Sequence, residues 1–438
     1  MGEWLDRRFG YGAAGSSLRV EVLGGATTFM TMAYILFVNG AILGGAGLDP
    51  AQVLTATALV AGVMTIAMGA ATNYPFALAP GMGINAAVAG TLVAAQGLSP
   101  AEAMGVIVAE GAAITILVAI GVREAILDAI PRSLQRAIGA GIGLFLAVIG
   151  LAEGGLVTRA TSPGALPVVQ LGDLRSPHTA VFLVGLVLAL ILSVRRVRGA
   201  LLIAIAAATV LALVIGEAPP PRAIVTLPDF GLLGHFSFGF VAKLGALGAV
   251  LAVFTLMLSD FFDTVGTAVG LGAEGGFLDE NGRLPRMRRV LLVDSLAAAV
   301  GGLASTSSAT TYIESASGIA DGARTGLASL VTGGLFLVAM FIAPLAGVVP
   351  AEATASALVV VGFLMAGMLA EIDWRDVPHA AAAFLTAVVM PFTWSISNGI
   401  GVGVITHVIL MTVAGRIREI NPLLWVVAAA FAAYFAAG

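Results

Sequence analysis

The feature that most constrains this chain is a succession of apolar segments, each long enough, or nearly so, to cross a lipid bilayer. A transmembrane helix needs about 20 apolar residues, and fewer where it is broken or lies inside a bundle. A further apolar stretch, 421–437, begins at Pro422 and is expected to be an interfacial helix or an extra span. The fourteen predicted spans are 21–43, 52–71, 75–95, 101–120, 137–152, 180–194, 199–216, 245–270, 290–304, 310–324, 326–347, 354–370, 379–393 and 396–414.

Composition leads to the same class of protein. Only 11% of the 438 residues are charged, 59% are hydrophobic, and the mean hydropathy is +1.03. A soluble domain carries roughly 25% charged residues, so this chain could not cover its apolar surface in water. The sequence therefore predicts an all-α polytopic membrane protein with the lipid bilayer as its solvent. Residues 1–19 are charged and short, so a cleaved signal peptide is not expected.

Several classes of function find no support in the composition. The net charge of −4 gives no indication of a nucleic-acid partner. There is no Cys, and the four His are scattered, so no metal site or other cofactor is expected. An enzyme would need a nucleophile–base pair or a metal set, and a channel would need a ring of carbonyls or like charges. Neither pattern is present, so we expect a transporter and not an enzyme.

The basic residues indicate how the chain is oriented. If the N-terminus is cytoplasmic, 17 of the 21 Lys and Arg residues fall on the cytoplasmic side and only 4 fall outside. Short cytoplasmic loops carry such an excess of positive charge. The four residues of the outer side are Arg159, Arg175, Arg222 and Lys243. We therefore expect a multi-pass protein of the inner (plasma) membrane of a bacterial cell with its N-terminus in the cytoplasm.

The fourteen spans divide into two sets of seven with a similar layout. Because seven is odd, the second copy must be inverted in the membrane. Inverted repeats are typical of transporters, whose sites lie at the bilayer midplane where broken helices meet. The loops are predicted to be short, the longest polar one being 272–289, which leaves no room for a separate soluble domain.

A first group of acidic residues lies inside the eighth predicted span, in the stretch DFFDTVGT at 260–267. Asp260 and Asp263 are three residues apart and share one helical face. Ionisable groups at membrane depth cost at least about 2.5–3.5 kcal/mol and usually face a functional cavity. Asp263 is the stronger candidate, whereas Asp260 could equally be a capping carboxylate at a helix end.

A second polar stretch, at 305–318, is too polar to face lipid. Residues 309–313 are rich in β-branched and aromatic side chains, which indicates an extended segment. Ser315 and Ser317 can then start a half-helix whose amides point into a cavity. Glu314 lies at this junction and is predicted to be a ligand or proton site.

The third stretch, at 74–86, contains Pro75, Pro80, Gly81 and Gly83, which together forbid a regular helix. Asn85 follows and offers both a donor and an acceptor, although an Asn here could also simply cap its half-helix. The inverted repeat relates the first and third spans of the two halves. It should bring Thr28, Asn85, Asp263 and Glu314 toward one midplane site.

Three other ionisable residues at membrane depth are weaker candidates. Glu110 and Asp294 are expected to hydrogen-bond neighbouring helices, and His407 is interpreted in the same way.

Four ordered motifs resemble those of the AzgA-like adenine/guanine/hypoxanthine permeases. These belong to a wider superfamily that includes the uracil and xanthine permeases and, more distantly, anion transporters. The likeness covers nearly the whole chain. The motifs are EVLGGATTFMTMAYI at 21–35, APGMGINA at 79–86, DFFDTVGT at 260–267 and TTYIESASG at 310–318.

The resemblance implies a seven-plus-seven inverted repeat with a core and a gate domain, and short strands before half-helices in spans 3 and 10. It also implies that the assembly can be a homodimer. The implied parts are the cytoplasmic N-terminus (1–20), the core domain (21–120 and 240–347), the gate domain (137–216 and 354–414) and an apolar C-terminal segment (415–438).

The resemblance further implies the residues of the site. Asp263 and Glu314 would hold the base, and Gly83 and Asn85 would complete the site. Where uracil permeases carry Glu in span 8, Asp263 is shorter and would leave room for a two-ring base.

The chemistry of these residues suits a purine. A purine is neutral and edged with N–H donors and ring-nitrogen acceptors, and a carboxylate accepts such N–H groups strongly in a dry site. Phe262 or Tyr312 could stack on the ring. Because the ligand is uncharged, coupling requires a proton, which we place on Asp263 or Asp260, with Glu314 as a further carboxyl. We therefore expect proton-coupled purine uptake, with transport of uracil, xanthine or an inorganic anion as the alternatives.

Overall fold

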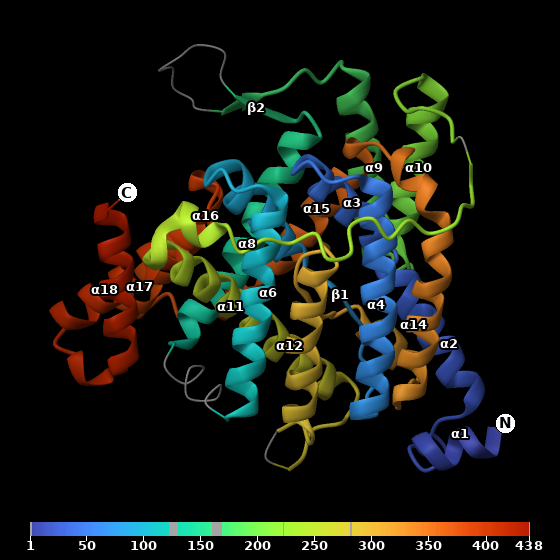
Figure 1. Cartoon of the computed structure of the whole chain (residues 1–438), viewed down its shortest axis with the longest axis horizontal. Coiled ribbons are helices and arrows are strands. Elements are labelled where there is room, and N and C mark those ends of the chain that lie inside the picture. The colour runs from blue at the N-terminus through green and yellow to red at the C-terminus, as the bar shows by residue number, and fades with distance from the viewer. Residues whose placement is uncertain (1, 122–129, 160–168, 222, 281–282, 438) are drawn as a thin grey trace.

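The computed structural model describes residues 2–121, 130–159, 169–221, 223–280 and 283–437 (Figure 1). It is a bundle of helices with two small two-stranded sheets. Within the described residues, nine helices are long and apolar enough to cross a bilayer, and four other apolar helices are shorter. The prediction of an all-α polytopic membrane protein is confirmed.

The first half of the chain follows the predicted segments closely. The first span is a broken helix, interrupted by a turn at Ala33 and Tyr34. Just before the turn, the Thr31 hydroxyl donates back to the carbonyl of Thr27 or Thr28, at 3.1 and 2.9 Å, and such bonds bend helices. The elements are α1 (Gly2–Phe9), α2 (Leu18–Met32), α3 (Ile35–Gly45), α4 (Pro50–Thr72), β1 (Leu78–Pro80), α5 (Met82–Ala86), the π-helix η1 (Ala87–Ala95), α6 (Pro100–Ala119), α8 (Arg132–Glu153), β2 (Val157–Arg159), β3 (Val169–Leu171), α9 (Pro177–Val194) and α10 (Ala200–Ile215).

The second half begins with the longest helix, α11, which is interrupted at Gly245, where φ is +69°. This interruption agrees with the predicted start of the eighth span at 245. The elements are α11 (Phe240–Glu274), α12 (Met287–Leu303), β4 (Ala309–Thr311), α13 (Ser315–Ala320), α14 (Gly326–Ala339), η2 (Met340–Gly347), α15 (Ala351–Ala366), η3 (Gly367–Glu371), α16 (Val377–Thr393), α17 (Ile396–Val413), η4 (Ile417–Glu419) and α18 (Pro422–Ala437).

One connection departs from the prediction of short loops. Residues 223–239, between α10 and α11, form no regular element and run across the bundle (Figure 1). Their backbone amides are bonded to other segments: Thr226 N donates to Phe341 O at 3.0 Å, and Ser237 N donates to Ala101 O at 2.8 Å. Because this stretch is itself largely apolar, a search for polar loops does not detect it.

The predicted strands of spans 3 and 10 are present and pair with each other. β1 and β4 are antiparallel, with Leu78 opposite Thr311 and Pro80 opposite Ala309. All six residues of the two strands are buried. Non-helical backbone at membrane depth is tolerated only where protein or water satisfies it, and each strand provides this for the other. Each is followed by a short helix, α5 or α13.

The helices form two packed groups, and the strand pair contacts α4 and α12 of the first group. One contains α2, α4, α6, α12 and α14, and the other contains α8, α9, α10, α15, α16 and α17, with α11 touching both. Glycines allow very close approach between helices within each group. A Cβ on Gly69 of α4 would lie 2.5 Å from Gly326 O, and one on Gly362 of α15 would lie 2.4 Å from Gly143 O of α8.

The pairs of packed helices repeat in the order of the chain. α4 packs on α14 and α6 on α12; likewise, α14 packs on α2 and α6 on α11. If the predicted spans are numbered 1 to 14, a shift of every number by seven turns the pair α4–α14 into α12–α6. The same shift turns the pair α2–α14 into α11–α6. The pairs α16–α17 and α9–α10 are related in the same way.

The apolar stretch at the end of the chain forms α18, which packs against α17 and α11.

Candidate functional site

The candidate site lies where β1, β4, their half-helices and the break between α2 and α3 come together. Glu314 stands immediately before α13, as the sequence predicted. Its Oε1 accepts a hydrogen bond of 2.7 Å from the hydroxyl of Tyr34. A carboxylate has about four acceptor positions, so this bond orients Glu314 and leaves it able to accept others.

The half-helix that carries Glu314 is held by α2. Thr31 Oγ1 is 2.8 Å from Ser317 Oγ, and Thr27 Oγ1 donates to Asp321 at 2.7 Å. Thr28 is buried against the same half-helix, because a Cβ on Gly318 would lie 2.3 Å from Thr28 Oγ1. The structure therefore places Thr28 behind α13, where it supports the position of Glu314.

Asp263 lies on α11 close to Glu314. Its carboxyl interacts electrostatically with the carboxyls of Asp294 and Glu314. Tyr312, at the end of β4, lies within the same electrostatic reach of Asp263 and Glu314. The Tyr312 hydroxyl donates to the carbonyl of Pro80 at 2.5 Å, which ties the two strands together. The two predicted carboxyls are thus within electrostatic reach of each other, although one belongs to α11 and the other precedes α13.

Asn85 is buried on α5, and neither atom of its side-chain amide has a hydrogen-bond partner among the described residues. It does not cap the half-helix, since Gly81 is the N-cap and no side-chain cap bond is formed. Leaving a buried polar group unsatisfied costs about 1–3 kcal/mol, and buried polar groups are nearly always bonded. A ligand with both donors and acceptors would satisfy this amide.

The structure explains the predicted site residue Gly83 by packing, whereas it does not describe the side chain of the other, Phe262. A Cβ on Gly83 would lie 2.4 Å from Ile142 Cγ2, so close packing of α5 against α8 accounts for this glycine. Phe262 belongs to α11, but its side chain lies outside the described part of the structure.

A second group of buried carboxylates lies behind β4. Asp294 accepts hydrogen bonds from Thr264 Oγ1 at 2.5 Å and from Thr311 N at 2.9 Å, which ties α12 to α11 and β4. The prediction that Asp294 bonds neighbouring elements is confirmed. Asp260 accepts from Ser308 Oγ at 3.4 Å, and Glu110 interacts electrostatically with Asp294.

Tyr34 and Thr31 are the site residues that the sequence analysis missed. Both lie in the first motif, near the end of α2, in a span that shows no charge at that depth. The available signal was a lone Tyr in the middle of an apolar span, because a buried Tyr hydroxyl needs a partner.

Two other predicted features can be placed. His407 lies on α17 beside His379, away from the Glu314 site. Across the described ranges, no three His, Cys, Asp or Glu side chains are grouped so that they could hold a metal ion.

Comparison with known sequences gives a coherent result. Residues 19–402 match the sequence model of the Permease family, the xanthine and uracil permeases. The chain is 38% identical to the adenine permease AdeP of Escherichia coli over 98% of this chain and 95% of that protein. It is 37% identical to the guanine/hypoxanthine permease PbuG of Bacillus subtilis over 98% of both chains, and 39% identical to the putative permease MJ0326 of Methanocaldococcus jannaschii over 99% and 98%.

Comparison with solved structures identifies the fold. The transmembrane domain of the cyanobacterial bicarbonate transporter BicA is similar with a TM-score of 0.67 at 16% identity, over 87% of this chain and 97% of that one. The murine anion transporter Slc26a9 is similar with a TM-score of 0.64 at 14% identity, over 91% of this chain and 69% of that one.

Proposed function

We propose that this chain takes up purine bases together with protons. It belongs to the Permease family of xanthine and uracil permeases and is a nucleobase transporter rather than an enzyme. The observation that carries the substrate class is the Glu314 carboxylate, which Tyr34 orients beside the break in the first span at 2.7 Å, with Asp263 within electrostatic reach of it. Relatives named as adenine and as guanine/hypoxanthine permeases support the same substrate class.

The recognition of the base follows from the chemistry of the site. Glu314 and Asp263 accept ring and amino N–H groups of the purine, in charge-assisted bonds that are strong where water is excluded. Asn85 faces the base with an amide that can donate and accept, and so it reads edges that carry either an amino group or a carbonyl. Its lack of a partner among the described side chains supports this role.

The other predicted residues take supporting parts in the proposal. Thr28 and Gly83 act through packing, against α13 and α8 respectively. Tyr312 or Phe262 stacks on the ring, and the Tyr34 hydroxyl holds the Glu314 carboxylate in position.

The coupling proton is carried by a carboxyl of the site. Because a purine is neutral, its accumulation requires a co-transported ion, for which we propose a proton on Asp263. Glu314 and Asp260 are the other carboxyls that we propose for the proton pathway. The electrostatic interaction of Asp263 with Asp294 and Glu314 supports this, because interacting carboxylates repel one another when all are ionised.

The architecture we propose for transport is a seven-plus-seven inverted repeat of fourteen spans. The packing pairs that exchange under a shift of seven spans, and the antiparallel pairing of β1 with β4, support this repeat. The group around α4 and α14 forms the core domain, and the group around α8 and α15 forms the gate domain. Transport follows when the core domain moves relative to the gate domain. The chain lies in the bacterial plasma membrane with its N-terminus in the cytoplasm, an orientation supported by the distribution of Lys and Arg.

Uptake into liposomes tests the proposal. The purified protein is reconstituted and supplied with radiolabelled adenine, guanine, hypoxanthine, xanthine, uracil or sulfate, with and without an inward proton gradient. We expect saturable uptake of purines that the gradient increases. Preference for uracil or xanthine would assign the protein a different nucleobase substrate within the same family. Sulfate uptake without purine uptake would overturn the proposed purine substrate class. Purine uptake that ignores the proton gradient and follows a sodium gradient would overturn the coupling.

A further inference from the structure

A cavity of about 340 Å³ lies apart from the Glu314 site, next to the loop between α17 and α18. Its wall is formed by the starts of α8, α16 and α18, by α17 and by the connecting η4. The residues that matter here are His379, His407, Met411, Arg418, Asn421 and Leu424. Ligand pockets in proteins are commonly about 300–1,000 Å³, so the cavity is large enough for a small organic molecule.

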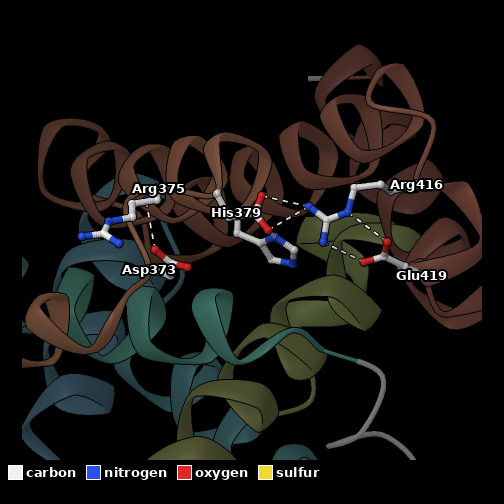
Figure 2. Close-up of polar contacts among 6 residues, drawn as sticks. Asp373, Arg375, His379, Arg416 and Glu419 are labelled. Carbon is white, nitrogen blue, oxygen red and sulfur yellow. Dashed lines mark hydrogen bonds and ion pairs between the residues drawn. The ribbon is translucent and has the colours of Figure 1, made fainter.

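One arginine binds the two carboxylates beside the cavity. Arg416 donates to both oxygens of Asp376, at 2.9 and 2.7 Å, and to both oxygens of Glu419, at 2.9 and 2.7 Å (Figure 2). These hydrogen bonds lower the pKa of Asp376 and of Glu419, and they raise the pKa of Arg416. Each oxygen of the two carboxylates, of which Glu419 lines the cavity, therefore already accepts a hydrogen bond from the same guanidinium.

The groups that remain for a ligand are mainly donors. Arg418 is exposed and has no hydrogen bond or ion pair with any described residue. Asn421 uses its Oδ1 to accept from Leu423 N at 3.0 Å, so it offers its NH₂ group. The groups of this lining that have no partner among the described residues are thus donors, which suit a ligand that accepts hydrogen bonds.

His407 is the second, independent sign of a ligand. It is only 1% exposed, it lines the cavity, and its Nδ1 has no hydrogen-bond partner among the described residues. Its ring is 5.0 Å from that of His379, whose Nδ1 lies 2.9 Å from Oδ2 of Asp376. Because buried polar groups are nearly always hydrogen-bonded, a ligand in the cavity would supply the partner that this imidazole lacks.

Helix ends favour a negative charge at this place. Pro131, His379 and Pro422 stand at the beginnings of α8, α16 and α18, and all three line the cavity. The N-terminal end of a helix carries a partial positive charge that favours anions. α17 presents its C-terminal end, with Met411 in its last turn, and η4 lines the cavity with Arg418 and Glu419.

We propose that this cavity binds a small organic phosphate ester, with the phosphate on Arg418 and the organic part against Met411 and Leu424. A guanidinium binds phosphate in a bidentate manner, and the apolar side of the cavity would suit a carbon-containing remainder. Bound there, the ligand would link α18 to α16 and α17. The same chemistry is offered by a soluble phosphate ester and by a phospholipid headgroup.

Glycerol 3-phosphate is a suitable probe, because it lacks a purine ring and does not report on the Glu314 site. Its binding to the purified full-length protein in neutral detergent is measured by calorimetry and by thermal unfolding, with glycerol as the control ligand. We expect glycerol 3-phosphate to bind and to raise the melting temperature, and glycerol to do neither. Absence of binding to the unmodified protein overturns the proposal.

Three variants locate the binding. Arg418→Gln removes an exposed side chain without a partner and should weaken binding about 10- to 150-fold, as expected for a lost charged hydrogen bond. His407→Leu removes an unsatisfied polar group, so the protein should stay folded while binding weakens. Arg375→Gln, an exposed arginine outside the cavity, is the matched control and should bind normally. Equal binding by Arg418→Gln and Arg375→Gln overturns the proposal.

Lipid nanodiscs identify the source of the phosphate. If the natural ligand is a lipid, nanodiscs of phosphatidylcholine and phosphatidylglycerol should compete with glycerol 3-phosphate and give a lower affinity than neutral detergent in the unmodified protein, and not in Arg418→Gln. If the ligand is soluble, the affinities in nanodiscs and in neutral detergent should be equal. Either result supports a phosphate-ester site and assigns its source. Purine uptake plays no part in the readout, so failure here leaves the proposed transport function intact.

Discussion

The two paired strands each lead into a short helix, and these two strand–helix arms have the same architecture but present different polar groups. In one, β1 leads into α5 and a π-helix and presents the neutral amide of Asn85. In the other, β4 leads into the six-residue α13 and presents the carboxylate of Glu314. Glu314 is fixed by Tyr34, whereas Asn85 has no partner among the described side chains.

This difference suggests a division of labour between the arms. A carboxylate can only accept, so its arm supplies strength toward N–H groups. An amide can donate or accept, so the other arm tolerates several purine edges and helps to choose among them. The four predictions below test this contrast.

The largest effect is expected for Glu314→Gln. The amide turns one acceptor into a donor that faces the N–H of the ligand, at a cost of about 2–4 kcal/mol, so high-affinity purine binding should be lost. Calorimetric titration with hypoxanthine measures this, and the exposed Glu371→Gln is the matched control. Unchanged affinity in a folded Glu314→Gln protein would remove this residue from the site.

Asp263→Asn should separate binding from coupling. An amide cannot carry the proton between the two faces, so accumulation driven by a proton gradient should disappear while some purine binding remains. Proteoliposome uptake with an imposed gradient measures this beside the exposed Asp373→Asn. Normal accumulation would place the proton on another group, with Asp260, Glu110 and His407 next in line.

Asn85→Ala should weaken purines unequally, by about 5- to 150-fold, at ~1–3 kcal/mol for each hydrogen bond lost. Because the amide has no protein partner, its removal should leave the melting temperature unchanged or higher. Competition among adenine, guanine and hypoxanthine, run beside melting curves and with Asn398→Ala as control, measures both. One common factor for all purines, with reduced stability, would make Asn85 a structural residue.

The smallest effect is expected for Tyr34→Phe. Loss of the 2.7 Å bond frees Glu314 to rotate but leaves its charge, so affinity should fall by about 10-fold, while the preference among purines stays the same. Binding titrations with three purines test this, with Tyr434→Phe as the control. A changed order of preference would show that the Glu314 arm also selects the base.

Much of the fold could be predicted because the membrane imposes simple rules on sequence. Apolar length placed the helices, and Pro and Gly at 75–83 indicated the interrupted third span. The β-branched run at 309–313 indicated the second strand, and β4 and α13 begin where expected. The connection at 223–239 lies between two predicted spans, but its length did not stand out because its residues are largely apolar.

The details of the site depend on contacts between residues that are distant in sequence. Nothing local to Tyr34 shows that its hydroxyl reaches Glu314, 280 residues away. A glycine at 83 is equally compatible with a nearby ligand and with a nearby side chain, and the structure places Ile142 there. Burial at membrane depth identified which polar residues matter, and tertiary packing decided what each one touches.

The most direct test of the division between the two arms is an experimental structure of the protein with hypoxanthine bound. We predict that the base lies between the arms, with an N–H group about 2.7–3.2 Å from a Glu314 oxygen and a second polar edge at the same distance from the Asn85 amide. A base bound to Glu314 with the Asn85 amide still unpaired, or bound away from both, would contradict the account.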